Sequence, residues 1–333
     1  MVGSVSQRIA KHTHYYVGKG KLDEIFKLSR DVEADMVIFD GELTPTQQRN
    51  LEQSLNIKVI DRTSLILDVF AMRAQTHEGR LQVGLAQHEY LLPRLVGQWT
   101  HLERLGGGIG TRGPGETQLE TDRRIIRTKI QKLKLDLQSV KKHRSLYKQK
   151  RRKEGIPIIS LVGYTNAGKS TLLNSLAKSE VLVENKMFST LDPITRRISF
   201  PGKKPFLLTD TVGFIQKLPT TLIAAFTATL EELKESDLIL HVIDITHKNA
   251  FEHSQVVNDL LKDLDLQQKP KLLVLNKIDL LTEDIHQYSS PPPDIYKDNN
   301  AIPISAYRRW GFDNLVESIT RIIEREELSL VNV

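Results

Sequence analysis

The segment GYTNAGKS, from Gly163 to Ser170, constrains the fold of this chain more than any other feature. It matches G-x-x-x-x-G-K-S and lies between an apolar run, IISLV, and a helical run, TLLNSLA. In that context small residues let backbone N–H groups wrap phosphates, Lys169 reaches the β- and γ-phosphates, and the Ser170 hydroxyl binds Mg²⁺. The predicted phosphate loop comprises Gly163, Tyr164, Thr165, Asn166, Ala167, Gly168, Lys169 and Ser170.

The motif DTVG follows a second apolar run, FLLT. An aspartate there can hold the hydration shell of the metal, and the Gly213 N–H can meet the γ-phosphate. We predict that Lys169 and Gly213 are catalytic. The nucleotide contacts predicted in this motif are Asp210, Thr211, Val212 and Gly213.

The motif NKID follows a third apolar run and indicates which base is bound. The Asp279 carboxylate can accept two hydrogen bonds from guanine, whereas adenine would leave it unpaired, which is costly. This argues against a P-loop ATPase or a nucleotide kinase. Asn276 is expected to tie this segment to the phosphate loop, and backbone N–H groups of SAY are expected at guanine O6. The predicted base contacts are Asn276, Lys277, Ile278, Asp279, Ser305, Ala306 and Tyr307.

The segment FSTLDPITR is the predicted switch I, which must supply a hydroxyl ligand for Mg²⁺. Thr190 is preferred to Thr195 because Thr195 begins a predicted strand, where packing in the sheet is its simplest role. Ser170 and Thr190 are thus the predicted metal ligands, and Thr190 is also predicted to be catalytic. The nucleotide contacts predicted in this segment are Phe188, Ser189, Thr190, Leu191 and Asp192.

The residue after Gly213 is Phe214, where many GTPases place a glutamine that orients the attacking water. Phenylalanine cannot do so, which predicts slow hydrolysis that a partner accelerates. We also consider Asn166 as a catalytic residue that helps to hold K⁺. The alternative is an asparagine that braces the loop.

The 333 residues divide into three predicted blocks. Residues 1–62 alternate apolar runs (34–40 and 57–61) with helical patterns, which predicts a small α/β unit. Residues 63–154 predict a long antiparallel helical hairpin. Residues 155–333 predict a GTP-binding domain of α/β class with a mostly parallel six-stranded sheet, because three of its apolar runs are nearly continuous.

The expected hairpin has one arm over Ser64–Arg104, kinked at Pro93, and a second arm with an apolar stripe from Leu119 to Tyr147. The glycine-rich segment 105–115 would be its tip loop. It lacks a Gly-Lys-Ser ending and does not follow a strand, so it is not a second nucleotide loop. A mobile linker is the plain alternative.

Charge is concentrated in the second arm. The chain has a net charge of +6, but residues 121–153 hold fourteen Lys or Arg and only two acidic residues, which leaves the rest at −6. Such a basic element predicts a polyanion partner, although a solvated helix face is the alternative. The predicted RNA contacts are Arg112, Arg123, Arg124 and Arg127.

The chain has no cysteine, no run of about 18 apolar residues and no apolar signal segment at its beginning. We therefore expect a cytoplasmic protein, without membrane insertion, and we expect a monomer.

The order GYTNAGKST, FSTLDPITR, DTVGF, NKID and SA, behind GGGIGTRGPGETQLETDRR, resembles the HflX family of translation-factor-class GTPases. VGKGKLDEI, ADMVIFDGELTPTQQRNLEQ and QTHEGRLQVGLAQHEYLLPRL resemble its N-terminal region, so the resemblance covers nearly the whole chain. It implies GTP hydrolysis with Mg²⁺, binding to the large ribosomal subunit and its rRNA, and splitting or rescue of ribosomes. Family members usually carry another strand and helix before VGKGK, whereas only about sixteen residues precede it here. The resemblance therefore implies either an N-terminal sheet that lacks an edge strand or a shortened form of the chain.

Two further functions remain open at this point. One is a non-enzymatic RNA-binding protein that uses GTP only as a structural ligand. This function remains open because Phe214 occupies the position of the glutamine that orients the attacking water. The other is a GTPase whose partner is not the ribosome.

Overall fold

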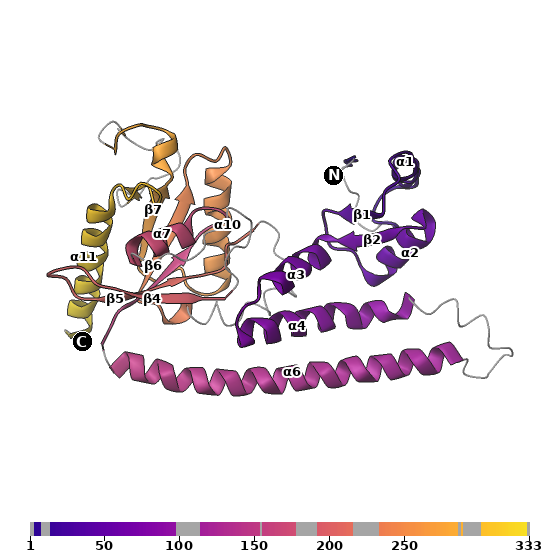
Figure 1. Ribbon diagram of the computed structural model, residues 1–333, viewed down its shortest axis with the longest axis horizontal. Coiled ribbons are helices and arrows are strands. Elements are labelled where there is room, and N and C mark those ends of the chain that lie inside the picture. Colours follow the sequence, from indigo (N-terminus) through magenta and orange to yellow (C-terminus); the bar gives the residue numbers. More distant parts are fainter. Residues whose placement is uncertain are drawn as a thin grey trace. The chain divides into compact units, whose positions relative to one another are not determined.

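The computed structural model describes residues 3–7, 14–97, 114–153, 155–177, 192–215, 233–285, 288 and 301–331 (Figure 1). The chain divides into two compact units. The first, here called the N-terminal unit, comprises Met1–Met72, Arg80–Ser139 and Pro219–Ala225. The second, the C-terminal unit, comprises Arg73–Gly79, Val140–Leu218 and Phe226–Val333.

The N-terminal unit begins with a small α/β arrangement. Helix α1 (Lys19–Asp31) precedes β1 (Met36–Phe39), and α2 (Pro45–Leu55) precedes β2 (Lys58–Asp61). The two strands pair in parallel, with Met36 opposite Lys58. Helix α2 begins where the Thr44 side chain and Gln47 form a capping box. The strands and helices predicted for this region are confirmed.

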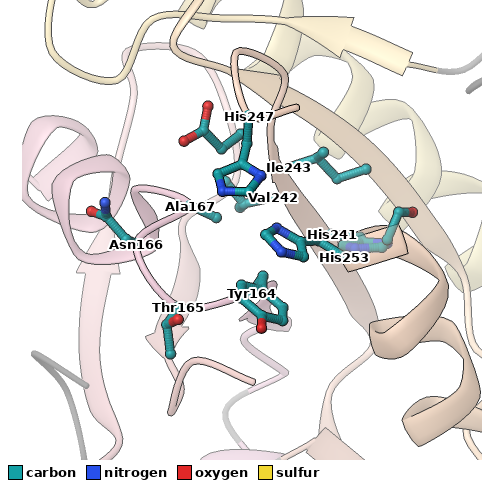
Figure 2. Close-up of a pocket in the computed structure, with 11 residues that line it drawn as sticks. Tyr164, Thr165, Asn166, Ala167, His241, Val242, Ile243, His247 and His253 are labelled. Carbon is teal, nitrogen blue, oxygen red and sulfur yellow. The ribbon is translucent and has the colours of Figure 1, made fainter. Parts of the chain in front are cut away.

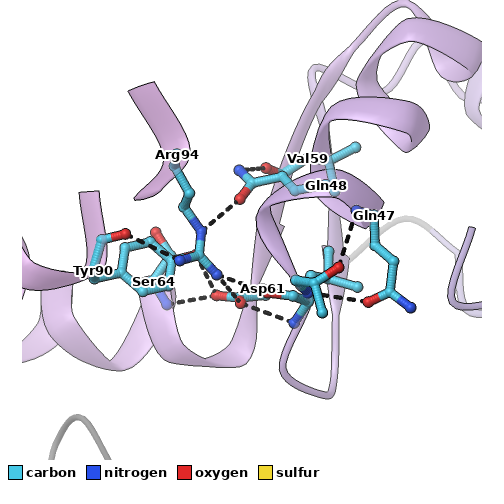
Figure 3. Close-up of polar contacts among 9 residues, drawn as sticks. Gln47, Gln48, Val59, Asp61, Ser64, Tyr90 and Arg94 are labelled. Atoms are coloured by element: carbon cyan, nitrogen blue, oxygen red, sulfur yellow. Dashed lines mark hydrogen bonds and ion pairs between the residues drawn. The ribbon is translucent and has the colours of Figure 1, made fainter. Parts of the chain in front are cut away.

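A buried carboxylate joins β2 to the helix α4 (His77–Leu91) and the 3₁₀ turn η1 (Leu92–Gly97) (Figure 3). Asp61 is 0% exposed and accepts hydrogen bonds from the N–H groups of Leu43 and Ser64 and from the Tyr90 hydroxyl. Arg94 pairs with Asp61 at 3.5 Å and lies over the Tyr90 ring. Sequence patterns gave no indication of this network.

The expected single helix over Ser64–Arg104 is wrong. Helix α3 (Arg62–Arg73) ends, the chain turns, and α4 begins at His77. Pro93 lies in η1 immediately after α4, so it ends that helix rather than kinking it, because proline lacks the N–H that a continuing helix needs.

The second helical arm is present as α6 (Pro114–Lys153), 40 residues long. It begins at a proline, the residue favoured at the first position of a helix, so Pro114 and Gly115 are helical rather than part of the predicted tip. Residues 98–113, which include the rest of that tip, lie outside the described residues. Ile126 and Ile130 of α6 pack on Leu95, and Lys134 pairs with Glu89 of α4 at 2.8 Å.

The C-terminal unit contains a six-stranded sheet of order β4-β5-β3-β6-β7-β8, in which only the β4–β5 pair is antiparallel. The strands are β3 (Ile158–Val162), β4 (Ile194–Ile198), β5 (Phe206–Asp210), β6 (Leu238–Asp244), β7 (Lys271–Asn276) and β8 (Ala301–Pro303). The helices are α7 (Lys169–Ala177), η2 (Ile278–Leu280), α10 (Ala250–Asp263) and α11 (Phe312–Val331). The mostly parallel six-stranded sheet that the sequence predicts is confirmed.

The sheet positions the phosphate loop, DTVG and NKID because each of these three motifs follows the carboxyl end of a strand. Parallel strands β3, β5, β6 and β7 end at the same edge, which is where doubly wound sheets bind ligands. In the described part of the chain, no helix has the length and apolar character needed to cross a membrane.

Candidate functional site

The phosphate loop connects β3 to α7, and two of its glycines have no room for a side chain. A Cβ atom on Gly163 would lie 2.3 Å from the Val242 carbonyl oxygen. Gly168 has φ +93°, and a Cβ atom there would lie 2.2 Å from the Asn276 side-chain nitrogen. The loop therefore needs glycine both for its backbone conformation and for its close packing.

Lys169 and Ser170 begin helix α7 and already have polar partners in the loop and in β5. The Lys169 ammonium donates to the carbonyl oxygens of Gly163 at 3.1 Å and Tyr164 at 3.0 Å. Burial lowers the pKa of Lys169, and the nearby Asp210 carboxylate offsets part of this effect, so that the pKa is about 8. A buried ammonium bonded mainly to carbonyl oxygens is well suited to attract an incoming phosphate.

The motif after β5 is built into the sheet. The Thr211 hydroxyl donates to the Leu161 carbonyl oxygen at 2.5 Å, and the Phe214 N–H donates to Gly163 at 3.1 Å. In return, the Thr165 N–H donates to the Phe214 carbonyl oxygen at 2.9 Å. A Cβ atom on Gly213 would lie 2.8 Å from the Thr165 Cα, so Gly213 lies directly against the phosphate loop.

Phe214 itself is buried. Its side chain is 5% exposed and packs in an apolar cluster with Val162, Leu233, Ile239 and Val257. The residue at the usual glutamine position therefore points into the core, where it cannot orient a water molecule.

Asn276, at the end of β7, connects three motifs. Its amide donates to the Ala167 carbonyl oxygen at 2.8 Å and accepts from the Ala306 N–H at 2.9 Å. The tie to the phosphate loop that the sequence predicts is therefore present. The Ser305 N–H also has a partner, the Trp310 carbonyl oxygen at 3.2 Å, so these two N–H groups can reach a base only by exchanging their present bonds.

The neighbouring residues of the NKID motif lie around the short turn η2. Lys277 has φ +72°, and its ammonium pairs with Asp244 at 2.7 Å. Ile278 is buried, while Asp279 is half-buried in η2 and makes no recorded hydrogen bond with the described residues. Tyr307 is 81% exposed. The Asp279 carboxylate is thus available for a ligand.

The predicted switch I is described only in part. Phe188, Ser189, Thr190 and Leu191 lie outside the described residues. The carboxylate of Asp192, a predicted nucleotide contact, accepts hydrogen bonds from Gln75 and Thr76. A contact of Asp192 with the nucleotide stays a prediction. Thr195 lies in β4 and bonds the Thr209 hydroxyl at 2.9 Å across the sheet.

A cavity of about 200 Å³ lies beside the phosphate loop, between that loop, the end of β6 and the start of α10 (Figure 2). The Tyr164 ring stacks on His253 with ring centroids 3.6 Å apart. Asn166 lines the cavity, is exposed and has φ +62°. Its two predicted roles, holding K⁺ and bracing the loop, both stay predictions. The cavity is also lined by His241, His247 and His253. The sequence analysis did not identify these three histidines, because no short motif connects them.

The predicted RNA contacts fall on α6 of the N-terminal unit. Arg124 and Arg127 are exposed and Arg123 is half-exposed, so all three are accessible to a partner. Arg112 lies outside the described residues.

The oxygen atoms at the start of α7 fit a hard divalent cation. The Ser170 hydroxyl donates to an Asp210 carboxylate oxygen at 2.6 Å, and Asp210 is 0% exposed. No cluster of three or more His, Asp or Glu side chains is placed to bind a metal within the described ranges. Such a site suits Mg²⁺, which binds through one or two side chains together with substrate phosphates and water.

Comparison with known proteins identifies the family. Three family models match the chain: GTP-binding GTPase N-terminal over residues 1–71, GTP-binding GTPase Middle Region over residues 73–151, and 50S ribosome-binding GTPase over residues 158–277. The GTPase HflX of Alkalihalophilus pseudofirmus is 53% identical over 331 residues, which cover 98% of this chain and 78% of that protein. The chain belongs to the HflX family.

Other HflX proteins are similarly close. The GTPase HflX of Caldanaerobacter subterraneus is 51% identical over 94% of this chain and 71% of its own length. That of Escherichia coli is 48% identical over 96% of this chain and 74% of its own length. Among solved structures, a complex of SsGBP with GDP is 28% identical, covers 94% of this chain and 88% of that chain, and has a TM-score of 0.52. HflX proteins are GTPases, so the family assigns this chain to the enzymes that hydrolyse GTP.

Proposed function

We propose that this HflX chain binds GTP with Mg²⁺ at the carboxyl edge of the six-stranded sheet and acts on the large ribosomal subunit in the cytoplasm, as a monomer. The observation that carries the nucleotide site is Asn276, which joins the phosphate loop to the Ala306 loop. Asp279, in the adjacent turn η2, would read the base through its free carboxylate.

The proposed roles follow from the geometry. Lys169 and the Gly213 N–H would neutralise charge on the γ-phosphate, and Ser170 and Thr190 would hold Mg²⁺, which supplies charge neutralisation at the phosphates. Because Phe214 is buried in the core, hydrolysis is expected to be slow until a partner supplies the missing group. Asn166 is exposed beside the loop and is the candidate K⁺ ligand, which a comparison of turnover in K⁺ and Na⁺ tests.

The ribosomal role is supported by two observations. The chain matches a 50S ribosome-binding GTPase model, and its charge is concentrated on residues 121–153, where Arg124 and Arg127 are exposed on α6. We propose that α6 and the glycine-rich segment before it contact rRNA. Splitting or rescue of ribosomes is the activity that this docking would serve.

The decisive experiment measures GTP turnover with and without purified large subunits at two salt concentrations. Stimulation that falls as salt rises supports docking of a basic element on RNA. Turnover that the subunits leave unchanged contradicts the ribosomal role and favours a GTPase with another partner. Absence of any turnover favours the non-enzymatic RNA-binding protein.

Base recognition has its own test. Asp279→Asn should weaken GTP binding and favour xanthosine triphosphate, because an amide can donate to the carbonyl group at C2 of xanthine. Unchanged GTP affinity in this variant contradicts the role of Asp279.

A further inference from the structure

A ring of the phosphate loop lies flat against a ring of helix α10. The Tyr164 and His253 rings are 3° from parallel with centroids 3.6 Å apart, and both line the cavity beside the loop (Figure 2). Both residues belong to the C-terminal unit. Stacked aromatic pairs attract each other beyond the effect of the area that they bury. The phosphate loop is therefore attached to a helix that carries none of the nucleotide motifs.

Helix α10 is a firm support for this contact. His253 lies in its first turn, where its N–H donates to the Asn249 carbonyl oxygen at 3.0 Å. Farther along the helix, Val257 and Leu261 are buried in an apolar cluster with Ile239 of β6. Because the helix packs on the sheet in this way, the core of the unit fixes the position of the His253 ring.

The residue that His253 contacts also holds the ammonium group of Lys169. The Tyr164 carbonyl oxygen accepts from this ammonium at 3.0 Å and from the Ala167 N–H at 3.2 Å. Two contacts therefore connect α10 to Lys169. The first is the ring stack, and the second is the hydrogen bond from Lys169 to the Tyr164 carbonyl oxygen.

The backbone of the phosphate loop is also attached to Phe214. The Thr165 N–H donates to the Phe214 carbonyl oxygen at 2.9 Å, and the Phe214 N–H donates to the Gly163 carbonyl oxygen at 3.1 Å. This attachment involves the neighbour of Gly213, the residue that is proposed to meet the γ-phosphate. The ring stack comes from α10 instead, so it supports Tyr164 independently of the segment that responds to the γ-phosphate.

We infer that His253 is a positioning residue, which holds Tyr164 so that the Tyr164 carbonyl oxygen keeps the Lys169 ammonium in place for the γ-phosphate. This inference rests on the proposed function, in which Lys169 neutralises charge on that phosphate. A charged group stabilises a transition state only where it is correctly placed, so a small displacement of the ammonium lowers the rate of hydrolysis.

The test measures single-turnover hydrolysis of Mg²⁺–GTP by the full chain, with the protein in saturating excess over GTP. His253→Ala and Tyr164→Leu should each lower the rate constant by about two- to twelvefold, the range expected for the loss of one ring pair. His253→Phe keeps a flat ring and should restore the wild-type rate constant. Burial, followed by the positive charge of His247, lowers the pKa of His253, so this ring is uncharged at pH 7 and phenylalanine is a conservative replacement.

Three features of the experiment separate positioning from general stability. Because the protein is in saturating excess, all of the GTP is bound, and a smaller folded fraction leaves the rate constant unchanged. Phe251→Ala removes an exposed ring from the same helix and should also leave the rate constant unchanged. The double variant His253→Ala/Tyr164→Leu should be no slower than the slower single variant, because both changes remove the same contact.

The inference and the proposed function can fail separately. If the wild type hydrolyses GTP and His253→Ala has the wild-type rate constant, or if His253→Phe is as slow as His253→Ala, the inference is wrong and the proposed function stands. If the wild type does not hydrolyse GTP, or if Lys169→Ala does not slow hydrolysis, the proposed role of the site fails, and the inference fails with it.

Discussion

The hydroxyl of Ser170 donates to a carboxylate oxygen of Asp210 at 2.6 Å, so the first residue of α7 after Lys169 is bonded to the last residue of β5. This pair places two oxygen atoms where the metal of a nucleotide complex is expected. Under the proposed function, this bond would be exchanged for a bond to the metal when the complex forms.

Ser170→Ala should therefore remove most of the effect of Mg²⁺ on nucleotide binding. The wild type should bind GDP more tightly in Mg²⁺ than in EDTA, whereas the variant should bind with nearly equal affinity in both. Titration of a fluorescent GDP analogue measures the difference. An unchanged response to Mg²⁺ in the variant would show that Ser170 is not a ligand.

Gly168→Ala should abolish nucleotide binding while the protein stays folded. The added Cβ would lie 2.2 Å from the Asn276 side chain, and φ +93° is unfavourable for alanine, so the tie between β7 and the phosphate loop must break. Gly202→Ala is the matched control, because Gly202 has φ +72° with no atom within 4 Å of the added Cβ. It should cost about 1 kcal/mol of stability and leave affinity unchanged.

His241 should make the protein sensitive to acid. Burial, followed by the positive charges of Lys271 and Lys169, lowers the pKa of His241 to about 3 from 6.5. Between these values the unfolded chain binds a proton that the folded chain does not, so stability falls as pH decreases from about 6.5 towards 3. The loss is on the order of 4 kcal/mol at the acid end.

His241→Leu should flatten this dependence, since it removes the titrating group from a site that is 1% exposed. Denaturant unfolding at several pH values between 4 and 7 measures it. Equal slopes of unfolding free energy against pH in the two proteins would refute this assignment to His241.

Asp61→Ala should destabilise the N-terminal unit. The change leaves Arg94, the Tyr90 hydroxyl and two N–H groups without their buried partner, and breaking a buried ion pair typically costs 3–5 kcal/mol. Asp40→Ala is the control, because the Asp40 side chain is 86% exposed in its pair with Arg62. Thermal unfolding followed by circular dichroism should show an earlier transition only for Asp61→Ala.

The sheet was predictable because its strands are local signals. Segments such as Ile158–Val162 and Lys271–Asn276 are largely apolar, as strands covered on both faces must be, and each leads into one of the predicted nucleotide motifs. The long helix α6 was predictable for a similar reason, since its apolar stripe repeats along one face.

The break before α4 was not predictable from the local sequence. The helical pattern runs through residues 74–76, and the group that stabilises the break, Asp192, lies 116 residues away from Thr76 in the chain. The stacking of Tyr164 on His253 was hidden in the same way, because it joins two elements that only the fold brings together. The hydrogen bonds of Asp192 with Gln75 and Thr76 were hidden for the same reason, since its place beside Thr190 in the sequence suggested only a nucleotide contact.

The two backbone hydrogen bonds that join Phe214 to Gly163 and Thr165 have a consequence for how the enzyme senses its ligand. They extend the parallel pairing of β3 and β5 beyond the ends of both strands, so backbone hydrogen bonds hold the phosphate loop against the segment around Gly213. Under the proposed function, a displacement of Gly213 on loss of the γ-phosphate would therefore have to stretch or break these two bonds.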